Sequence, residues 1–450
     1  MLPPELLSMV CNHVPKKDLK TLRLVCKSYG QAAVSHVFDE IFMSFNMADL
    51  RIAKLVVLRF KQYIRTLVFS SVYYRAIPDG DFELHFQDAF LDDESTEHSD
   101  FAYQRYRAIR KKQQKTLKSG ACQTYLAFAL STMPRLKKII LTDWRSSRSM
   151  STESMLRYDS RHIPFCPAED CGLDAHEHFD FVPIRQSGLE RTGPLNPWTI
   201  ILLALSATST YVPEITMETV KETEYVDDKA LDTSAFRLPP LALCEAKLCF
   251  AALTKLRLSL AIDPGNFTSG GRTSCVHRNL PKLLRAAVNL ECLAIEVYDW
   301  EDTVTGGTSS FDCILGRCKF LKLKSLILAF FDSTEQELLQ LLKYSTDLAQ
   351  LTLDGHTLTS GSWAGLINKL RAKLSLSDVE LDQLFGGFAE PCENTEFLDR
   401  DGTVEKFFLG KGPNPFTKEA IQRYEDERKP GRTLYQVAEG YRSRYHRFHK

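Results

Sequence analysis

A leucine pattern recurs along the middle of the chain and constrains its fold more than any other feature. Each copy reads Leu-x-x-Leu-x-Leu, with Ile allowed for Leu. Apolar residues that alternate in this way are typical of a strand with one buried face. The copies occupy residues 136–141, 253–258, 290–295, 323–328 and 348–353, with a looser sixth copy within 370–381. The chain is therefore expected to repeat one short, half-buried strand.

The stretches between the copies indicate what kind of repeat this is. The central residues Leu256, Leu293, Leu326 and Leu351 are spaced 37, 33 and 25 residues apart. Helix-period stretches lie between the strands, at 280–288 and 333–345, and Ser333 with Gln336 forms a capping-box pattern in the second. We therefore expect an α+β or α/β repeat, an irregular leucine-rich-repeat-like strand–helix solenoid with strands on its concave side. A single α/β sandwich built from the same units is the alternative.

Three short helices are predicted at the start of the chain. Apolar residues recur every four positions from Leu6 to Val14 in the first helix. Asp18 is expected to cap the second helix, whose apolar face ends in a buried Cys26, and the third covers residues 31–38. Three short helices make a very small core, and their apolar residues exceed what it can bury. The excess must face the rest of the chain or another protein.

This opening stretch resembles the F-box. The resemblance is carried by the run LPxELLxxV followed by DLxxLRxVCK, with Tyr29 where many members have Trp. It covers roughly a tenth of the chain, about the size of one minimal helical module. The remainder is similar to the degenerate repeat region of many F-box proteins, including a large fungal set.

The resemblance implies a non-catalytic, substrate-recognition adaptor of a Skp–cullin–F-box type E3 ubiquitin ligase. The F-box would bind the Skp-type adaptor, and through it a cullin–RING ligase, while the repeats would bind a protein substrate of unknown identity. A protein-interaction scaffold that works outside any ubiquitin ligase is the alternative. The adaptor-facing candidates are Leu2, Pro3, Leu6, Leu7, Val10, Leu19, Leu22 and Val25. Some of them must instead hold the helices together, and helical period does not distinguish the two roles.

The chain is too long for one core, and we expect four regions. They are the F-box at 1–45, a linker and first irregular repeats with a charged loop and helix at 46–129, the repeat domain at 130–385 with an insert at 145–200, and a C-terminal cap and basic tail at 386–450. Within the second region, residues 81–100 carry eight acidic and no basic residues, and residues 105–118 carry seven basic and no acidic ones. Either these charges offset each other or the basic segment docks an acidic partner.

The insert holds a cluster of metal-ligand side chains, Cys166, Cys171, His176 and His178. Thiolate and imidazole suit zinc, but the spacing C-x4-C-x4-H-x-H departs from that of zinc sites, which favours a surface loop. A metal-dependent enzyme using this insert is the third functional alternative. No serine-elbow, phosphate-loop or zinc-protease motif occurs, so neither a catalytic residue nor a cofactor is predicted.

The overall charge argues against two further classes of partner. The chain has 57 basic and 57 acidic residues, so no net field attracts nucleic acid or a membrane, although residues 441–448 form a basic, aromatic tail. The longest apolar run, near 198–207, is half of the ~20 residues that span a bilayer and predicts a buried helix. Twelve scattered cysteines and no secretory signal indicate reduced thiols in the cytoplasm or nucleus.

Overall fold

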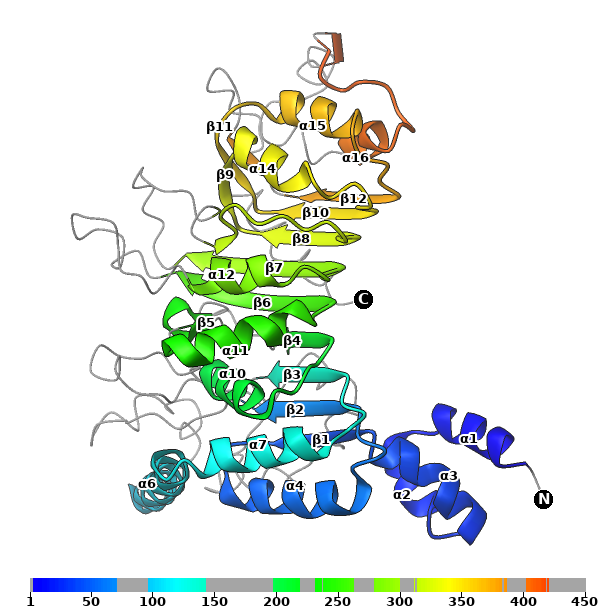
Figure 1. Cartoon of the computed structure of the whole chain (residues 1–450), viewed down its shortest axis with the longest axis vertical. Coiled ribbons are helices and arrows are strands. Elements are labelled where there is room, and N and C mark those ends of the chain that lie inside the picture. Colours follow the sequence, from blue (N-terminus) through cyan, green and yellow to red (C-terminus); the bar gives the residue numbers. More distant parts are fainter. Residues whose placement is uncertain are drawn as a thin grey trace. The chain divides into compact units, whose positions relative to one another are not determined.

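The computed structural model describes residues 3–70, 96–142, 197–218, 231–236, 238–262, 279–299, 311, 314–382, 384–386, 402–417 and 419–420 (Figure 1). The chain forms two compact units, residues 1–290 with 297–305 and residues 291–296 with 306–450. Both units alternate parallel strands with helices, which confirms the predicted leucine-rich-repeat-like strand–helix fold. No described helix combines the length and the apolarity that a membrane crossing requires.

The first unit opens with three helices, α1 (Pro4–His13), α2 (Lys16–Leu22) and α3 (Lys27–Val37). Pro4 suits the start of α1 because a first-turn proline loses no hydrogen bond that the helix needs. Helix α2 begins at Lys16, so Asp18 lies inside its first turn and the predicted N-cap is wrong. The predicted third helix begins earlier than residue 31, at Lys27.

The rest of the first unit contains a parallel sheet whose strands follow chain order. These strands are β1 (Glu40–Met43), β2 (Thr66–Ser70), β3 (Lys138–Thr142), β4 (Glu214–Glu218) and β6 (Lys255–Ile262), with the short β5 (Leu231–Asp232) paired to the end of β6. One register row contains the buried residues Ile41, Leu67, Ile139, Ile215 and Leu256. Each strand therefore buries its apolar side against the same layer, as stacked repeats require.

Helices cover one face of this sheet (Figure 1). They are α4 (Met47–Phe60), α7 (Ala121–Thr132), α10 (Pro197–Thr208), α11 (Pro240–Ala251) and α12 (Asn279–Ala286), with a 3-10 turn η4 (Thr233–Phe236) beside α10. Helices α4, α7, α10, α11 and α12 form a row in which each contacts the next, and α6 (Thr96–Lys118) contacts α4 and α7. The buried residues of α10 confirm the buried helix predicted at 198–207.

The second unit repeats this arrangement. Its main strands are β7 (Cys292–Asp299, through which the unit boundary runs), β8 (Ser325–Ala329), β10 (Gln350–Asp354) and β12 (Asp378–Asp382), all parallel. The motif residues Leu293, Leu326 and Leu351 share one buried register row with Val379. A smaller parallel sheet contains β9 (Asp332–Thr334), β11 (Thr357–Ser360) and β13 (Phe385–Gly386), and the helices are α14 (Glu335–Leu342), α15 (Trp363–Arg371) and α16 (Thr403–Phe408).

The same pair of hydrogen bonds joins the starts of neighbouring strands. The carbonyl oxygen of Arg65, just before β2, accepts the N–H groups of Lys137 (2.8 Å) and Lys138 (3.1 Å) at the start of β3. Five other carbonyls accept an equivalent pair of bonds, those of Asp39, Pro213, Glu291, Lys324 and Ala349. Because these bonds recur, the residues just before the strands line up along one edge of the sheet within each unit, which we call the N-terminal edge.

Helix α14 begins one residue later than the predicted capping box. The side chain of Thr334 accepts the N–H of Glu337 at 3.2 Å, and the Glu337 carboxylate accepts the N–H of Thr334 at 2.7 Å. The predicted Ser333–Gln336 box is wrong because the Ser333 hydroxyl is hydrogen-bonded to Nε2 of the buried His356, 2.7 Å away.

Candidate adaptor-binding surface

The three N-terminal helices enclose a very small core. Cys11, Leu19 and Ala33 are buried in it, one from each helix, and Val14, Leu22, Ala32 and Val37 pack around them. Burial raises the pKa of the Cys11 thiol, so this cysteine serves as a small apolar side chain. Cys26 was predicted to be buried here and is exposed, because α2 ends at Leu22 and Cys26 precedes α3.

Large apolar side chains remain on the outside of this core. On α1, Leu6, Met9 and Val10 are 45%, 61% and 44% exposed, and their i, i+3, i+4 spacing places them on one helix face. Between α2 and α3, Leu24 and Val25 are 78% and 66% exposed. These five large apolar side chains therefore remain in contact with water on the outside of the module.

The structure separates the predicted adaptor-binding residues by burial. Pro3, Leu6, Val10 and Val25 are exposed, Leu22 is partly buried, Leu7 and Leu19 are buried, and Leu2 lies outside the described residues. Leu7 and Leu19 therefore pack inside the module. The sequence reasoning missed Met9 and Leu24, and the i+3 spacing from Leu6 would have indicated Met9.

Polar and aromatic contacts join the three helices to the sheet. Lys16 at the start of α2 forms an ion pair with Asp39, whose carbonyl accepts the N–H groups of Arg65 and Thr66 at the start of β2. The Phe38 ring stacks on Phe60 at the end of α4, with centroids 3.7 Å apart. The module is thus anchored on one side, and α1 and the α2–α3 connection carry the exposed apolar residues.

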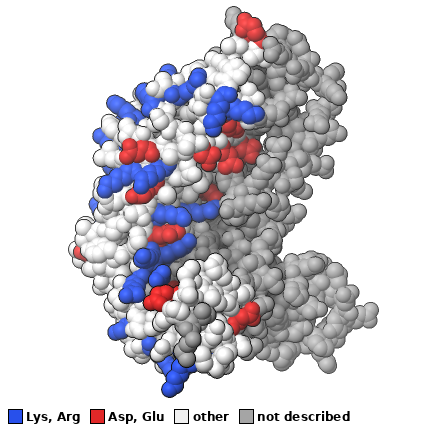
Figure 2. Space-filling model, turned by 90° about the vertical axis from the view of Figure 1, so that its right-hand side faces the viewer, with Lys and Arg blue, Asp and Glu red and all other residues white. Residues whose placement is uncertain are grey.

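Charged residues along the N-terminal edge pair with one another. Glu214 on β4 contacts Lys138 on β3 at 2.9 Å and Lys255 on β6 at 3.2 Å. Partial burial alone would raise the pKa of Glu214, but the hydrogen bonds and charges of the two lysines lower it. In the second unit, Glu291 and Lys324 pair at 2.8 Å. Figure 2 faces this edge and shows Lys and Arg interspersed with Asp and Glu.

A buried polar cluster surrounds the start of α4. The Asp49 carboxylate accepts hydrogen bonds from the Ser44 hydroxyl at 2.5 Å and the Asn46 amide at 3.5 Å. Gln113 of α6 donates to the Asn46 side-chain oxygen at 3.3 Å. Burial raises the pKa of Asp49 to about 6, against the lowering effect of its hydrogen bonds. The hydrogen bond from Gln113 to Asn46 ties α6 to the first repeat.

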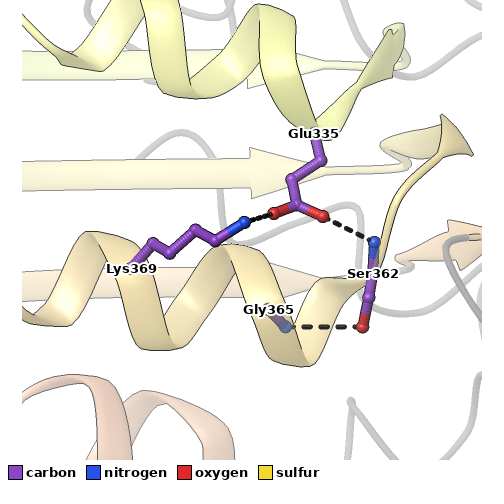
Figure 3. Close-up of polar contacts among 4 residues, drawn as sticks. All are labelled: Glu335, Ser362, Gly365 and Lys369. Atoms are coloured by element: carbon purple, nitrogen blue, oxygen red, sulfur yellow. Dashed lines mark hydrogen bonds and ion pairs between the residues drawn. The ribbon is translucent and has the colours of Figure 1, made fainter.

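In the second unit, a carboxylate couples two consecutive helices (Figure 3). Glu335 at the start of α14 accepts the backbone N–H of Ser362, the N-cap of α15, at 2.9 Å, and pairs with Lys369 at 2.5 Å. The Ser362 hydroxyl accepts the N–H of Gly365 at 3.4 Å. The bond from Lys369 and the Ser362 N–H lower the pKa of Glu335 against a smaller effect of burial. This arrangement satisfies two of the free N–H groups at the start of α15.

The predicted metal ligands and the basic tail are not placed. Cys166, Cys171, His176 and His178, and residues 441–448, lie outside the described residues. Within the part of the chain that the structure describes, no group of three or more His, Cys, Asp or Glu side chains could hold a metal ion. Burial raises the pKa of the Cys122 and Cys249 thiols to about 12 and about 11, which leaves both protonated and unreactive near neutral pH.

Comparison with known protein families finds an F-box domain over residues 1–56. No curated protein matches the chain. The match covers α1 to α3, β1 and the first part of α4. The chain therefore carries an F-box domain, and this domain implies a substrate-adaptor role through binding of a Skp-type adaptor.

Proposed function

We propose that this chain is the substrate-recognition subunit of a Skp–cullin–F-box type E3 ubiquitin ligase. Residues 1–45 bind the Skp-type adaptor, and the repeat region over 130–385 binds a protein substrate. In this proposal the chain is a non-catalytic subunit that works in the cytoplasm or nucleus. Its type is that of fungal F-box proteins with leucine-rich-repeat-like repeats. The observation that carries the proposal is an F-box domain that leaves apolar side chains of α1 and of the α2–α3 connection exposed.

The exposed side chains suit the insertion of apolar residues into a partner groove. Leu6, Met9 and Val10 lie on one face of α1 at the spacing by which amphipathic helices dock. Full burial of such a side chain contributes roughly 1.5–3 kcal/mol, and since each is about half-exposed here, covering it contributes roughly 1 kcal/mol. From the predicted set, the exposed Pro3, Leu6, Val10 and Val25 are the adaptor-facing residues that we propose.

The decisive test is adaptor binding by full-length variants with a matched control. Val10→Asp/Val25→Asp places charges at two exposed apolar sites and leaves the module's buried residues intact. Leu241→Asp/Leu248→Asp makes the same change at exposed sites on α11, outside the F-box domain. Titration with purified Skp-type adaptor should show at least about tenfold weaker binding for the first variant and unchanged binding for the second.

Two results would contradict the proposal. One is a wild-type chain that does not bind the adaptor under conditions where other F-box proteins bind, and the other is equal binding by Val10→Asp/Val25→Asp. Affinity capture of the chain from cells then distinguishes a ligase subunit from a scaffold that works outside a ligase. Recovery of adaptor together with cullin supports the ligase role, whereas adaptor without cullin supports a scaffold that works outside a ubiquitin ligase.

A further inference from the structure

Helix α6 carries a stripe of cations on its exposed side. Arg107, Lys111, Lys115 and Lys118 are all exposed, and their spacing places them within roughly 80° of one another around the helix. Residues 107–118 contain no acidic residue. The stripe is about 16 Å long at the helical rise of 1.5 Å per residue.

The packing of α6 fixes the direction in which this stripe points. Gln113, Thr116 and Leu117 are buried on the other side of the helix, at 1%, 4% and 6% exposure. Gln113 also donates to Asn46 in the buried cluster at the start of α4. Helix α6 contacts α4 and α7 and stands beside the row of repeat helices (Figure 1). Because the buried side faces the repeats, the cations face outward.

The lysines of the stripe differ from two lysines at the N-terminal edge of the sheet. Lys138 and Lys255 both pair with the Glu214 carboxylate. Lys111, Lys115 and Lys118 form no ion pair with any residue that the structure describes. Neighbouring like charges at i+3 and i+4 destabilise a helix slightly. The helix dipole favours cations in the last turn, which accounts for Lys115 and Lys118 but not for Lys111.

We propose that this stripe docks an acidic, extended segment of a partner protein. Lys111 and Lys115 are four residues apart, about 6 Å along the helix axis, and Lys118 follows three residues later, about 4.5 Å further on. In an extended chain, side chains on one side recur every two residues, about 6.8 Å. Since lysine side chains are long and flexible, the three ammonium groups can reach carboxylates at every second position of a strand-like segment. If the proposed ligase role holds, this partner is the recruited substrate, and only that label depends on the proposed function.

Two other anionic partners fit less well. Sites for single-stranded nucleic acid combine cations with aromatic side chains, and residues 107–118 contain no aromatic residue. A membrane-surface helix needs a free apolar face, whereas the Leu117 side of α6 is buried against the repeats.

The test measures binding of a fluorescent twelve-residue peptide, with Glu at every second position, to the full chain by anisotropy. The variant Lys111→Gln/Lys115→Gln/Lys118→Gln should bind the peptide about tenfold more weakly than wild type, a change equivalent to 1.4 kcal/mol. Lys137→Gln/Lys282→Gln/Lys373→Gln removes the same number of charges from exposed lysines elsewhere and should bind within about twofold of wild type. The peptide assay needs no Skp-type adaptor, so its failure is distinguishable from failure of the proposed function.

Four outcomes would overturn the proposal. The first is that the peptide does not bind wild type, and the second is that both lysine variants lose the same affinity for it. The third is that an oligothymidylate binds more tightly than the peptide through the same three lysines. The last is that the peptide binds only after Asp92, Asp93 and Glu94 are changed to amides. The third would assign the stripe to nucleic acid. The last would mean that the chain's own acidic residues compete for the stripe.

Discussion

Lowering the pH should destabilise the second unit through His356. The imidazole is fully buried between the rings of Phe331 and Trp363, with centroids 6.3 and 5.8 Å away. Its Nε2 is hydrogen-bonded to Ser333, and its Nδ1 has no hydrogen-bond partner among the described residues. Burial removes the ring from water and so disfavours its charged form, which lowers the pKa of His356 from 6.5 to about 3.

The sign and size of the effect follow from proton linkage. The unfolded chain binds a proton at this histidine below pH 6.5, whereas the folded chain binds it only near pH 3. Stability from His356 is therefore complete above pH 6.5 and is lost as the pH falls from 6.5 toward 3. The slope is about 1.4 kcal/mol per pH unit, so the loss between pH 7.5 and 5.0 is about 2 kcal/mol.

The assay is equilibrium urea unfolding of the full chain at pH 7.5, 6.5, 5.5 and 5.0, for wild type and His356→Gln. Gln keeps a polar group near Ser333 and does not titrate, so the difference in unfolding free energy between the two proteins isolates the histidine. This difference should shift by about 2 kcal/mol against wild type between pH 7.5 and 5.0. Ser333→Ala should keep the wild-type slope. A pH-independent difference between wild type and His356→Gln would refute the reasoning.

Three further predictions concern other buried or strained positions. Burial raises the pKa of Asp49 to about 6, so its stabilising contribution is present below pH 4 and is lost as the pH rises through 6. Between pH 4 and 8 in urea unfolding, the free energy of unfolding of Asp49→Asn should therefore increase relative to that of wild type by up to about 3 kcal/mol. Glu335→Gln should lower stability by about 1 kcal/mol at neutral pH and speed hydrogen exchange of the Ser362 amide, and unchanged exchange would contradict the capping role. Gly355→Ala, whose new Cβ would lie 2.3 Å from a ring carbon of Phe330, should lower the melting temperature more than Gly120→Ala, a position with a similar positive φ and no atom within 4 Å of the new Cβ.

The repeat strands could be predicted where leucine or isoleucine occupies both inward positions. All three apolar positions of each predicted copy are buried, as in Leu323, Leu326 and Leu328. Strands β1 and β4 do not match the pattern because their second inward residues are Met43 and Met217. Burial needs an apolar side chain of the right size, so a pattern limited to leucine and isoleucine misses strands that are equivalent in the fold.

Local caps were predicted less well than periodic segments because several side chains compete for each one. The sequence offers both Ser333–Gln336 and Thr334–Glu337 as boxes for α14. The choice depends on His356, 23 residues away in sequence, which binds the Ser333 hydroxyl and leaves Thr334 to cap the helix. A contact between distant residues therefore sets a local boundary, and no window around α14 contains that information.

The same limit explains why the F-box surface could not be resolved from the sequence. Leu6 and Leu7 are adjacent on α1, and a wide apolar stripe accommodates either as the inward residue. The structure buries Leu7 together with Cys11, which lies four positions later on the same face of α1, and leaves Leu6 45% exposed. A core this small leaves apolar side chains over. Phe38 packs against Phe60 and is shielded in this way. The exposed apolar side chains on α1 and just before α3 need a partner to remove them from water.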